Sequence, residues 1–207
     1  VMEASPDVLF VASAGNDGNL APAYGDLEVE PHYPCMEDTP ALPAQEPLEN
    51  VICVASSDLD DGKYASSNYG ASGVDLAAPG VSILSTVQSG NYAFKTGTSM
   101  AAPHVSGAAS LLRQLQPELS PAEVKQRILA SVEPAPEFAS TYPTVSGGRL
   151  DLARLFAAQL QPPELIGPAD GATLTRVPVL RWTTPEERLV YTIEVDAPPV
   201  TDRRGRS

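Results

Sequence analysis

The sequence predicts an α/β fold, a mostly parallel sheet with flanking helices, over residues 1–160. Apolar runs of strand length alternate with helical patterns along this region, which is the order that a parallel sheet requires. The linker-like segment Gln161-Pro162-Pro163 follows, and short β-rich runs come after it. We therefore expect a second, β-sandwich-like domain over residues 161–199 and a disordered tail over residues 200–207, because residues 201–207 contain no apolar side chain.

Four apolar runs are the expected strands of the first domain. The first run, Val8–Ala14, is continuously apolar, which is typical of a parallel strand buried on both faces. The other three are Val51–Ser56, Val74–Ala77 and Ser82–Thr86. A polar, proline-rich stretch, residues 17–50, separates the first two runs, and connections of that length are usually functional or disordered.

Three helices are predicted after the fourth strand. The first begins at the turn before Ser99 and continues to about residue 115, and its apolar run Val105–Leu112 is expected to be buried. The second is marked by Ser120-Pro121-Ala122-Glu123, which combines an N-cap serine, a proline at the first helical position and the glutamate of a capping box. The third follows Asp151, which is a candidate N-cap.

The octapeptide Gly97-Thr98-Ser99-Met100-Ala101-Ala102-Pro103-His104 places a serine where a turn meets a helix. The N–H groups of a first helical turn have no partner within the helix, and the helix dipole adds partial positive charge there. Such a position suits a nucleophile that attacks a carbonyl and must hold the resulting oxyanion. The alternative, a small-residue helix cap that packs against a sheet, is disfavoured because a second motif lies upstream.

The second motif is the end of the first strand, where Asn16 follows a run of small residues. A polar amide at the carboxyl end of a central strand lies where open α/β sheets bind ligands. Alone, an asparagine before Asp17 and Gly18 would be better explained as a turn residue. Together the two motifs resemble those of the subtilisin-like serine proteases (subtilases), over roughly residues 5–158. The resemblance implies that Ser99 is the nucleophile and that Asn16 is the side-chain donor of the oxyanion hole.

The resemblance also implies substrate-binding residues. Ser13, Ala14 and Gly15, on the strand before the asparagine, are similar to the substrate-binding edge of the family. The segment that contains His32 and Tyr33 resembles the one that lines the pocket for the substrate residue before the scissile bond. For His32, a solvent-facing loop position is the alternative.

A serine hydroxyl also needs a base, commonly a histidine oriented by a carboxylate. His104 follows Ser99 by five positions in the helix, about 500° of rotation and hence about 140° away, so we expect it to be a buried, structural histidine. The loop residue His32 is not placed as the base either. In subtilases the Asp and His motifs precede the Asn motif, so we expect both motifs to lie outside this chain. The chain then resembles the carboxyl half of a catalytic domain. We expect it to be inactive, or nearly so, on its own.

The leading hypothesis is therefore a serine endopeptidase that hydrolyses peptide bonds. One alternative is a non-catalytic subtilase-like binding or structural module. Another is that the β-rich segment is the functional part. Its runs Val179–Thr183 and Leu189–Val195 resemble the opening strands of a fibronectin-III or immunoglobulin-like sandwich, truncated relative to the seven strands or so of such domains.

Composition and the resemblance also limit which partners are expected. The net charge of -13 argues against nucleic acid, and no apolar run is long enough to span a membrane. The resemblance implies protein or peptide substrates, secretion, and a propeptide in the full-length protein, although no signal peptide is visible. It implies that catalysis needs no cofactor and that a structural calcium ion is present, as in many members of the family. The carboxylates of the turn Asp58–Gly62 could bind a cation, but a solvated turn explains them better. Cys35 and Cys53 lack metal-site spacing, and the sequence leaves a disulfide between them open.

Overall fold

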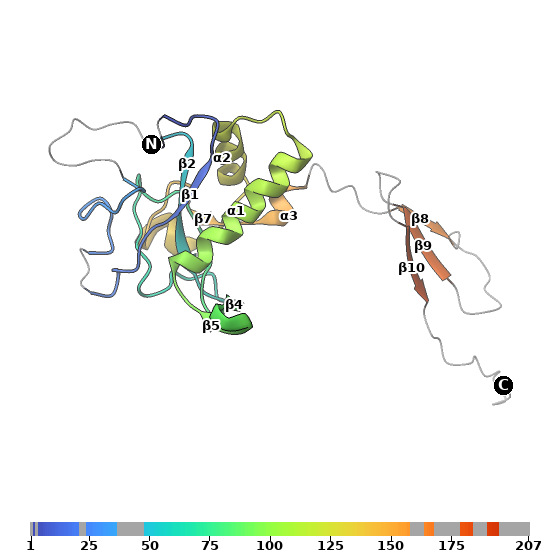
Figure 1. The fold of residues 1–207 in the computed structure, drawn as a ribbon, viewed down its shortest axis with the longest axis horizontal. Coiled ribbons are helices and arrows are strands. Elements are labelled where there is room, and N and C mark those ends of the chain that lie inside the picture. The colour runs from blue at the N-terminus through green and yellow to red at the C-terminus, as the bar shows by residue number, and fades with distance from the viewer. Residues whose placement is uncertain are drawn as a thin grey trace. The chain divides into compact units, whose positions relative to one another are not determined.

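The computed structural model describes residues 2, 4–20, 24–36 and 48–157, together with three later strands. The chain divides into two compact units, Val1–Phe156 and Ala157–Ser207 (Figure 1). The expected linker and the expected tail lie outside the described residues. In the described part of the chain, no helix is both long and apolar enough to cross a membrane.

The first unit is built on a mostly parallel sheet, as predicted. Its order is β1-β2-β3-β7-β6, in which the first four strands run parallel and the last pairs antiparallel with its neighbour. Their bounds are Phe10–Ser13 (β1), Val51–Ser57 (β2), Leu76–Pro79 (β3), Gly148–Arg149 (β7) and Glu133–Pro134 (β6). Register places Ser13 of β1 opposite Val54 of β2, so the carboxyl ends of the central strands meet at one edge of the sheet.

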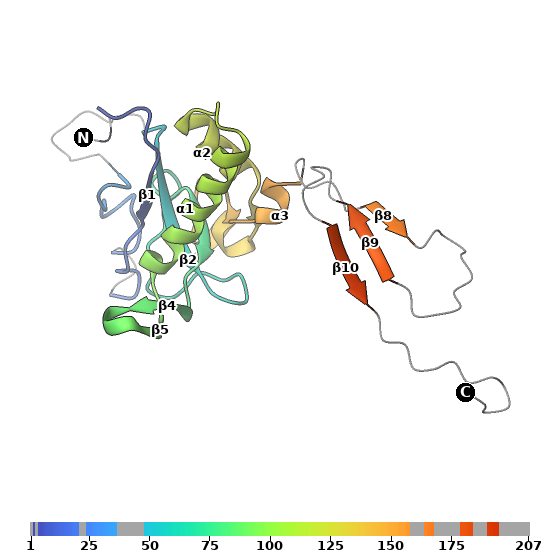
Figure 2. The ribbon, with the colours of Figure 1, turned by 45° about the vertical axis from the view of Figure 1, so that its right-hand side comes forward.

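Both faces of β2 and β3 are covered. Ile52 and Val54 belong to one apolar cluster and Cys53 and Ala55 to another, because successive side chains of a strand point to opposite faces. The first cluster contains the helices α1 (Thr98–Leu115), α2 (Pro121–Ala130) and α3 (Leu152–Leu155), and Figure 2 shows α1 running along the sheet beside β1 and β2. The second lies under loops and the short π-helix η2 (Glu137–Thr141).

Strand β1 departs from its prediction. All four of its residues are only partly buried, whereas the apolar run predicted burial on both faces. The reason is its position at the edge of the described sheet, where β2 is its one neighbour. Leu9 and Val11 still pack against the cluster under α1.

The predicted strand Ser82–Thr86 forms, but outside the parallel sheet. It is β4 (Ile83–Val87), which pairs antiparallel with β5 (Asn91–Lys95) in a separate hairpin. The hairpin lies at the amino end of α1 in both ribbon views (Figures 1 and 2). A short apolar run carries no information on its pairing partner, so the sequence could predict the strand and not its sheet.

The helix ends agree with the predicted caps. The Ser120 side chain accepts a hydrogen bond from the Glu123 N–H and the Glu123 carboxylate accepts one from the Ser120 N–H, which completes the capping box. This carboxylate has a lowered pKa, because the Ser120 N–H donates to its charged form. The Asp151 side chain caps α3 through the Arg154 N–H.

Only one face of α1 is buried. Its buried residues are Thr98, Ala101, Ala102, Val105, Ala108, Ala109 and Leu112, which repeat with the spacing of one helical face. Leu111, inside the run predicted to be buried, is 48% exposed. A continuous apolar and small-residue run does not say which face a neighbour covers.

The second unit contains the three-stranded antiparallel sheet β10-β9-β8. Strands β9 (Val179–Thr183) and β10 (Val190–Glu194) coincide with the two predicted β-rich runs. Strand β8 (Glu164–Gly167) follows the expected linker and was not predicted, because its apolar run is short and is followed at once by Gly167 and Pro168.

Candidate active site

Ser99 is the second residue of α1, and its side chain is exposed. Within the described residues, neither its N–H nor its hydroxyl has a hydrogen-bond partner. A cavity of about 660 Å³ opens beside it, lined by β4, Lys95 and the first turns of α1 including Met100, Pro103 and His104. An exposed hydroxyl and a free first-turn N–H at the mouth of a cavity meet the basic requirements of a nucleophile.

Asn16 is brought to the same place from the other end of the sequence. It follows β1, and its Oδ1 accepts a hydrogen bond from the N–H of Thr98, the residue before Ser99, at 3.0 Å. Because the amide oxygen is engaged there, the Nδ2 group is left to donate to a ligand. The structure thus unites the two residues that the sequence singled out, 83 positions apart.

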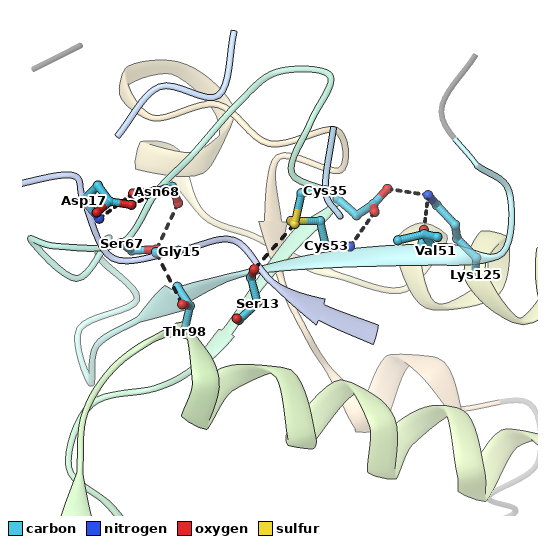
Figure 3. The surroundings of a disulfide bond; sticks show 11 residues. Ser13, Gly15, Asp17, Cys35, Val51, Cys53, Ser67, Asn68, Thr98 and Lys125 are labelled. Atoms are coloured by element: carbon cyan, nitrogen blue, oxygen red, sulfur yellow. Dashed lines mark hydrogen bonds and ion pairs between the residues drawn. A yellow bond between two sulfur atoms is a disulfide. The ribbon is translucent and has the colours of Figure 1, made fainter. Parts of the chain in front are cut away.

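Two glycines allow this close approach. Gly97, the N-cap of α1, has φ of 144°, and a Cβ at this position would lie 3.1 Å from Asn16 Oδ1. Gly15 has φ of 100°, and its carbonyl accepts hydrogen bonds from the Thr98 hydroxyl at 3.3 Å and from the Asn68 N–H at 3.1 Å (Figure 3). Positive φ values are readily adopted only by glycine.

The predicted substrate-binding segments also meet. The His32 ring packs on Gly15, since its Cε1 would lie 3.1 Å from a Cβ added to that glycine. Tyr33 is 53% exposed. Ala14 is buried and donates its N–H to the Val54 carbonyl, whereas Ser13 is partly buried. A substrate role for any of these residues remains a prediction.

A disulfide fastens the segment that contains His32 and Tyr33. Cys35 is bonded to Cys53 of the buried strand β2, which decides the pairing that the sequence left open. The Cys35 Sγ also lies 3.5 Å from the Ser13 carbonyl oxygen (Figure 3). The loop is therefore held against the end of β1 by a covalent bond to the core of the sheet.

His104 corrects one expectation. Its side chain is exposed rather than buried, because the described chain leaves this face of α1 uncovered. The expected structural hydrogen bond is present, between His104 Nδ1 and the Met100 carbonyl at 2.9 Å. Neither His104 nor His32 is hydrogen-bonded to Ser99 in the described part of the chain. These are the two histidines of the sequence.

Two polar residues near the site were not predicted. Asn68 is 1% exposed and contacts the chain on both sides of Asn16. Lys63 donates to the carbonyls of Tyr64, Ala65 and Ser67 at 3.0–3.1 Å, and burial lowers the pKa of its ammonium group. Neither belongs to a motif whose spacing alone indicates a function.

The described residues could bind a metal ion only through a group of ligand side chains. They contain no group of three or more His, Cys, Asp or Glu side chains that could hold one. In the acidic turn, one Asp58 oxygen accepts the N–H groups of Asp60 and Gly62, both at 3.0 Å, and Asp61 pairs with Arg149. These carboxylates stabilise the turn and do not fit a calcium ion.

Comparison with known proteins shows the family of the chain. The profile of the subtilase family matches residues 1–156, and the chain belongs to that family. It is 46% identical to thermitase of Thermoactinomyces vulgaris over 104 residues, which are 50% of this chain and 30% of thermitase. It is 36% identical to subtilisin BL of Lederbergia lenta over 124 residues, 60% of this chain and 38% of that protein.

Solved protease structures share the fold. A protease from Pseudoalteromonas arctica superposes with a TM-score of 0.56 and 29% identity, covering 73% of this chain and 43% of that one. The prenylagaramide maturation protease PagA gives 0.55 and 29%, with coverage of 73% and 50%. The chain spans about a third of the length of the curated relatives described above.

Proposed function

We propose that the protein containing this chain is a serine endopeptidase in which Ser99 attacks the peptide carbonyl. The observation that carries the proposal is the Asn16–Thr98 hydrogen bond of 3.0 Å. It holds a free carboxamide donor beside the first turn of a helix whose second residue is an exposed serine with an unpaired N–H. A serine hydroxyl with two nearby donors is the arrangement that acyl transfer requires.

In this mechanism the Ser99 hydroxyl oxygen bonds to the carbonyl carbon, and its proton passes to a base. The Asn16 Nδ2 and the Ser99 N–H donate to the oxyanion of the tetrahedral intermediate. The base returns the proton to the leaving amine as the C–N bond breaks, and water then hydrolyses the acyl-enzyme by the same steps. In the part of the chain that the structure describes, neither histidine is bonded to Ser99, so in this proposal another part of the full-length protein supplies the base and the chain alone should have little or no activity.

The substrates in this proposal are proteins or peptides. The end of β1, Ser13 to Gly15, and the neighbouring His32 and Tyr33 form the substrate-binding edge, which the Cys35–Cys53 disulfide holds in place. A disulfide also supports an oxidising compartment and hence secretion. A propeptide and a structural calcium ion outside the described residues complete the proposal, and neither takes part in a catalytic step.

A fluorophosphonate probe tests the nucleophile. The full-length protein should be labelled at Ser99, and Ser99→Ala should abolish both labelling and cleavage of a chromogenic peptide. Ser106→Ala is the control, because Ser106 lies on the same helix and, among the described residues, its hydroxyl bonds only to the Ala102 carbonyl; it should leave both intact. An unlabelled, folded wild-type protein would support a non-catalytic module, and efficient turnover by the isolated chain would contradict the need for an external base.

A further inference from the structure

Asn68 contacts both neighbours of Asn16. Its N–H donates to the Gly15 carbonyl at 3.1 Å, its Oδ1 accepts from the Asp17 N–H at 2.7 Å, and its Nδ2 donates to the Asp17 carboxylate at 3.3 Å. Figure 3 shows this side chain between Gly15 and Asp17. We propose that Asn68 is a positioning residue that sets the direction of the Asn16 carboxamide, an inference that rests on the proposed function.

The fit between Asn68 and the strand end is tight. A Cβ at Gly15 would lie 2.5 Å from Asn68 Nδ2, so the Asn68 carboxamide packs directly on the Gly15 backbone. The side chain is 1% exposed, and both of its polar atoms are paired. A buried amide that is hydrogen-bonded through both its oxygen and its nitrogen favours a single geometry, because rotation would break these bonds without solvent to replace them.

Asn68 is itself anchored to the core. The Ser67 hydroxyl donates to the Asn68 carbonyl at 3.0 Å and accepts from the N–H of Ser56, in strand β2, at 2.9 Å. The ammonium group of Lys63 donates to the Ser67 carbonyl at 3.0 Å. A continuous path of hydrogen bonds therefore joins the buried strand β2 to the two residues that flank Asn16.

The other end of the Asn16 side chain is held by α1 through the Thr98 N–H. Its backbone is thus fixed by Asn68 and its amide oxygen by Thr98, which leaves the Nδ2 donor with one direction. A donor aimed in advance at the oxyanion acts in the transition state, so loss of the aim should lower kcat and leave KM unchanged.

A double-mutant cycle in the full-length protein, with a chromogenic peptide, tests the inference. Asn16→Ala should lower kcat by about 10²–10³, the factor already known for an oxyanion-hole asparagine of a subtilisin. Asn68→Ala should lower kcat about 10- to 100-fold, since displacements near 1 Å can have effects of this size. The double variant should lie within about threefold of Asn16→Ala, because Asn68 acts through Asn16.

Asn50→Ala is the matched control. Asn50 is also buried, and its Nδ2 donates to three carbonyls before the opposite end of β1, those of Met2, Ser5 and Val8, each at 3.1 Å. This variant should lower the Tm without changing kcat. Where Asn68→Ala does not fold, Asn68→Ser enters the same cycle, because its hydroxyl is polar and uncharged but is too short to reach both the Asp17 N–H and the Asp17 carboxylate.

The outcomes are distinct. An unchanged kcat in a folded Asn68 variant, or factors that multiply in the double variant, would overturn the positioning role and leave the proposed peptidase function intact. An unchanged kcat in Asn16→Ala would overturn the oxyanion-donor role of Asn16 and with it the positioning role of Asn68, whereas the loss of cleavage in Ser99→Ala tests the peptidase function separately. A fall in kcat for Asn50→Ala equal to that for Asn68→Ala would show that the effect is general loosening of β1 and would likewise overturn the positioning role.

Discussion

The Oδ1 atom of Asn16 accepts a hydrogen bond from the N–H of Thr98 at 3.0 Å, across 82 positions of sequence. Helix α1 has no side-chain cap from its own N-cap residue, Gly97. Asn16 therefore satisfies one of the unpaired donors at the start of this helix. One carboxamide thus has two separable tasks, since its oxygen stabilises the helix and its nitrogen is the proposed oxyanion donor.

Substitution of Asn16 should separate these tasks. Asn16→Asp keeps an acceptor for the Thr98 N–H and places a negative charge at a helix N-terminus, so the Tm should be retained or raised. It removes the donor, so kcat should fall. Asn16→Leu removes both groups and should lower kcat and the free energy of unfolding, the latter by about 1 kcal/mol. Thermal unfolding and steady-state kinetics measure the two effects; an Asp variant with full kcat would contradict the donor role.

Gly97→Ala should impair the site without removing any polar group. The φ of 144° is strained for alanine, and the new Cβ would lie 3.1 Å from Asn16 Oδ1. We expect a loss of about 1–3 kcal/mol in the free energy of unfolding and a fall in kcat. The control is Gly107→Ala in the same helix, where no atom lies within 4 Å of the added Cβ. It should raise stability by about 0.5–1 kcal/mol and leave kcat unchanged. Equal stability changes in the two variants would contradict the strain at Gly97.

Removal of the disulfide should act on substrate binding. Cys35 and Cys53 are 18 positions apart, and opening a loop of that length costs about 3 kcal/mol of stability on the chain-entropy estimate. Cys35→Ala with Cys53→Ala should also raise KM, because the segment with His32 and Tyr33 loses its bond to β2. Dithiothreitol should raise the KM of the wild type and leave that of the double variant unchanged. A wild-type KM insensitive to full reduction would show that the segment keeps its place without the bond.

The parts predicted correctly from sequence are local. The capping box at Ser120 and Glu123 and the Asp151 cap involve residues within one helical turn, so their spacing is sufficient. Ser99 and Asn16 were singled out because each lies in a dense motif at the end of an element, and their catalytic roles remain predictions. Burial of β1 and of His104 was predicted wrongly, because burial depends on which neighbours cover a face and a single run of residues carries no such information.

The contacts that hold the site residues in place could not be predicted from the sequence. Asn68 reaches Asp17 across 51 positions, and an asparagine in a polar loop is ordinarily a turn residue. The ion pair of Asp75 and Lys125 could not be predicted from the sequence either, because Asp75 lies directly before β3 and Lys125 lies in α2. Contacts of this kind follow from the pairing of strands and the docking of helices, which no local pattern encodes.

The ion pair of Asp75 and Lys125 gives the protein a pH-dependent element next to Cys53 of the disulfide. Lys125 Nζ donates to the Val51 carbonyl at 2.6 Å (Figure 3) and lies 2.9 Å from Asp75 Oδ1, while Asp75 Oδ2 accepts from the Cys53 N–H at 2.8 Å. Burial raises the pKa of Asp75, against the opposing effect of Lys125. Because the folded-state pKa lies above the unfolded one, protonated Asp75 favours folding. Its contribution is complete below the unfolded pKa and is lost as pH rises through the folded pKa.

Lys125→Met should make this dependence steep. Without the ammonium group the Asp75 carboxylate is buried beside the Cys53 N–H alone, so its pKa should rise further, and at neutral pH the variant should lose about 3–5 kcal/mol. The loss should shrink as pH falls through the pKa of Asp75, since a neutral carboxyl group needs no cation. Urea unfolding between pH 4 and 8 measures it. Arg127→Met is the control: Arg127 is an exposed residue of the same helix, bonded to Gln116, and should change stability by less than about 0.5 kcal/mol at every pH. A loss for Lys125→Met that is equally large at pH 4 and 8 would assign the effect to the lost Val51 hydrogen bond and to packing instead of to the charge of Asp75.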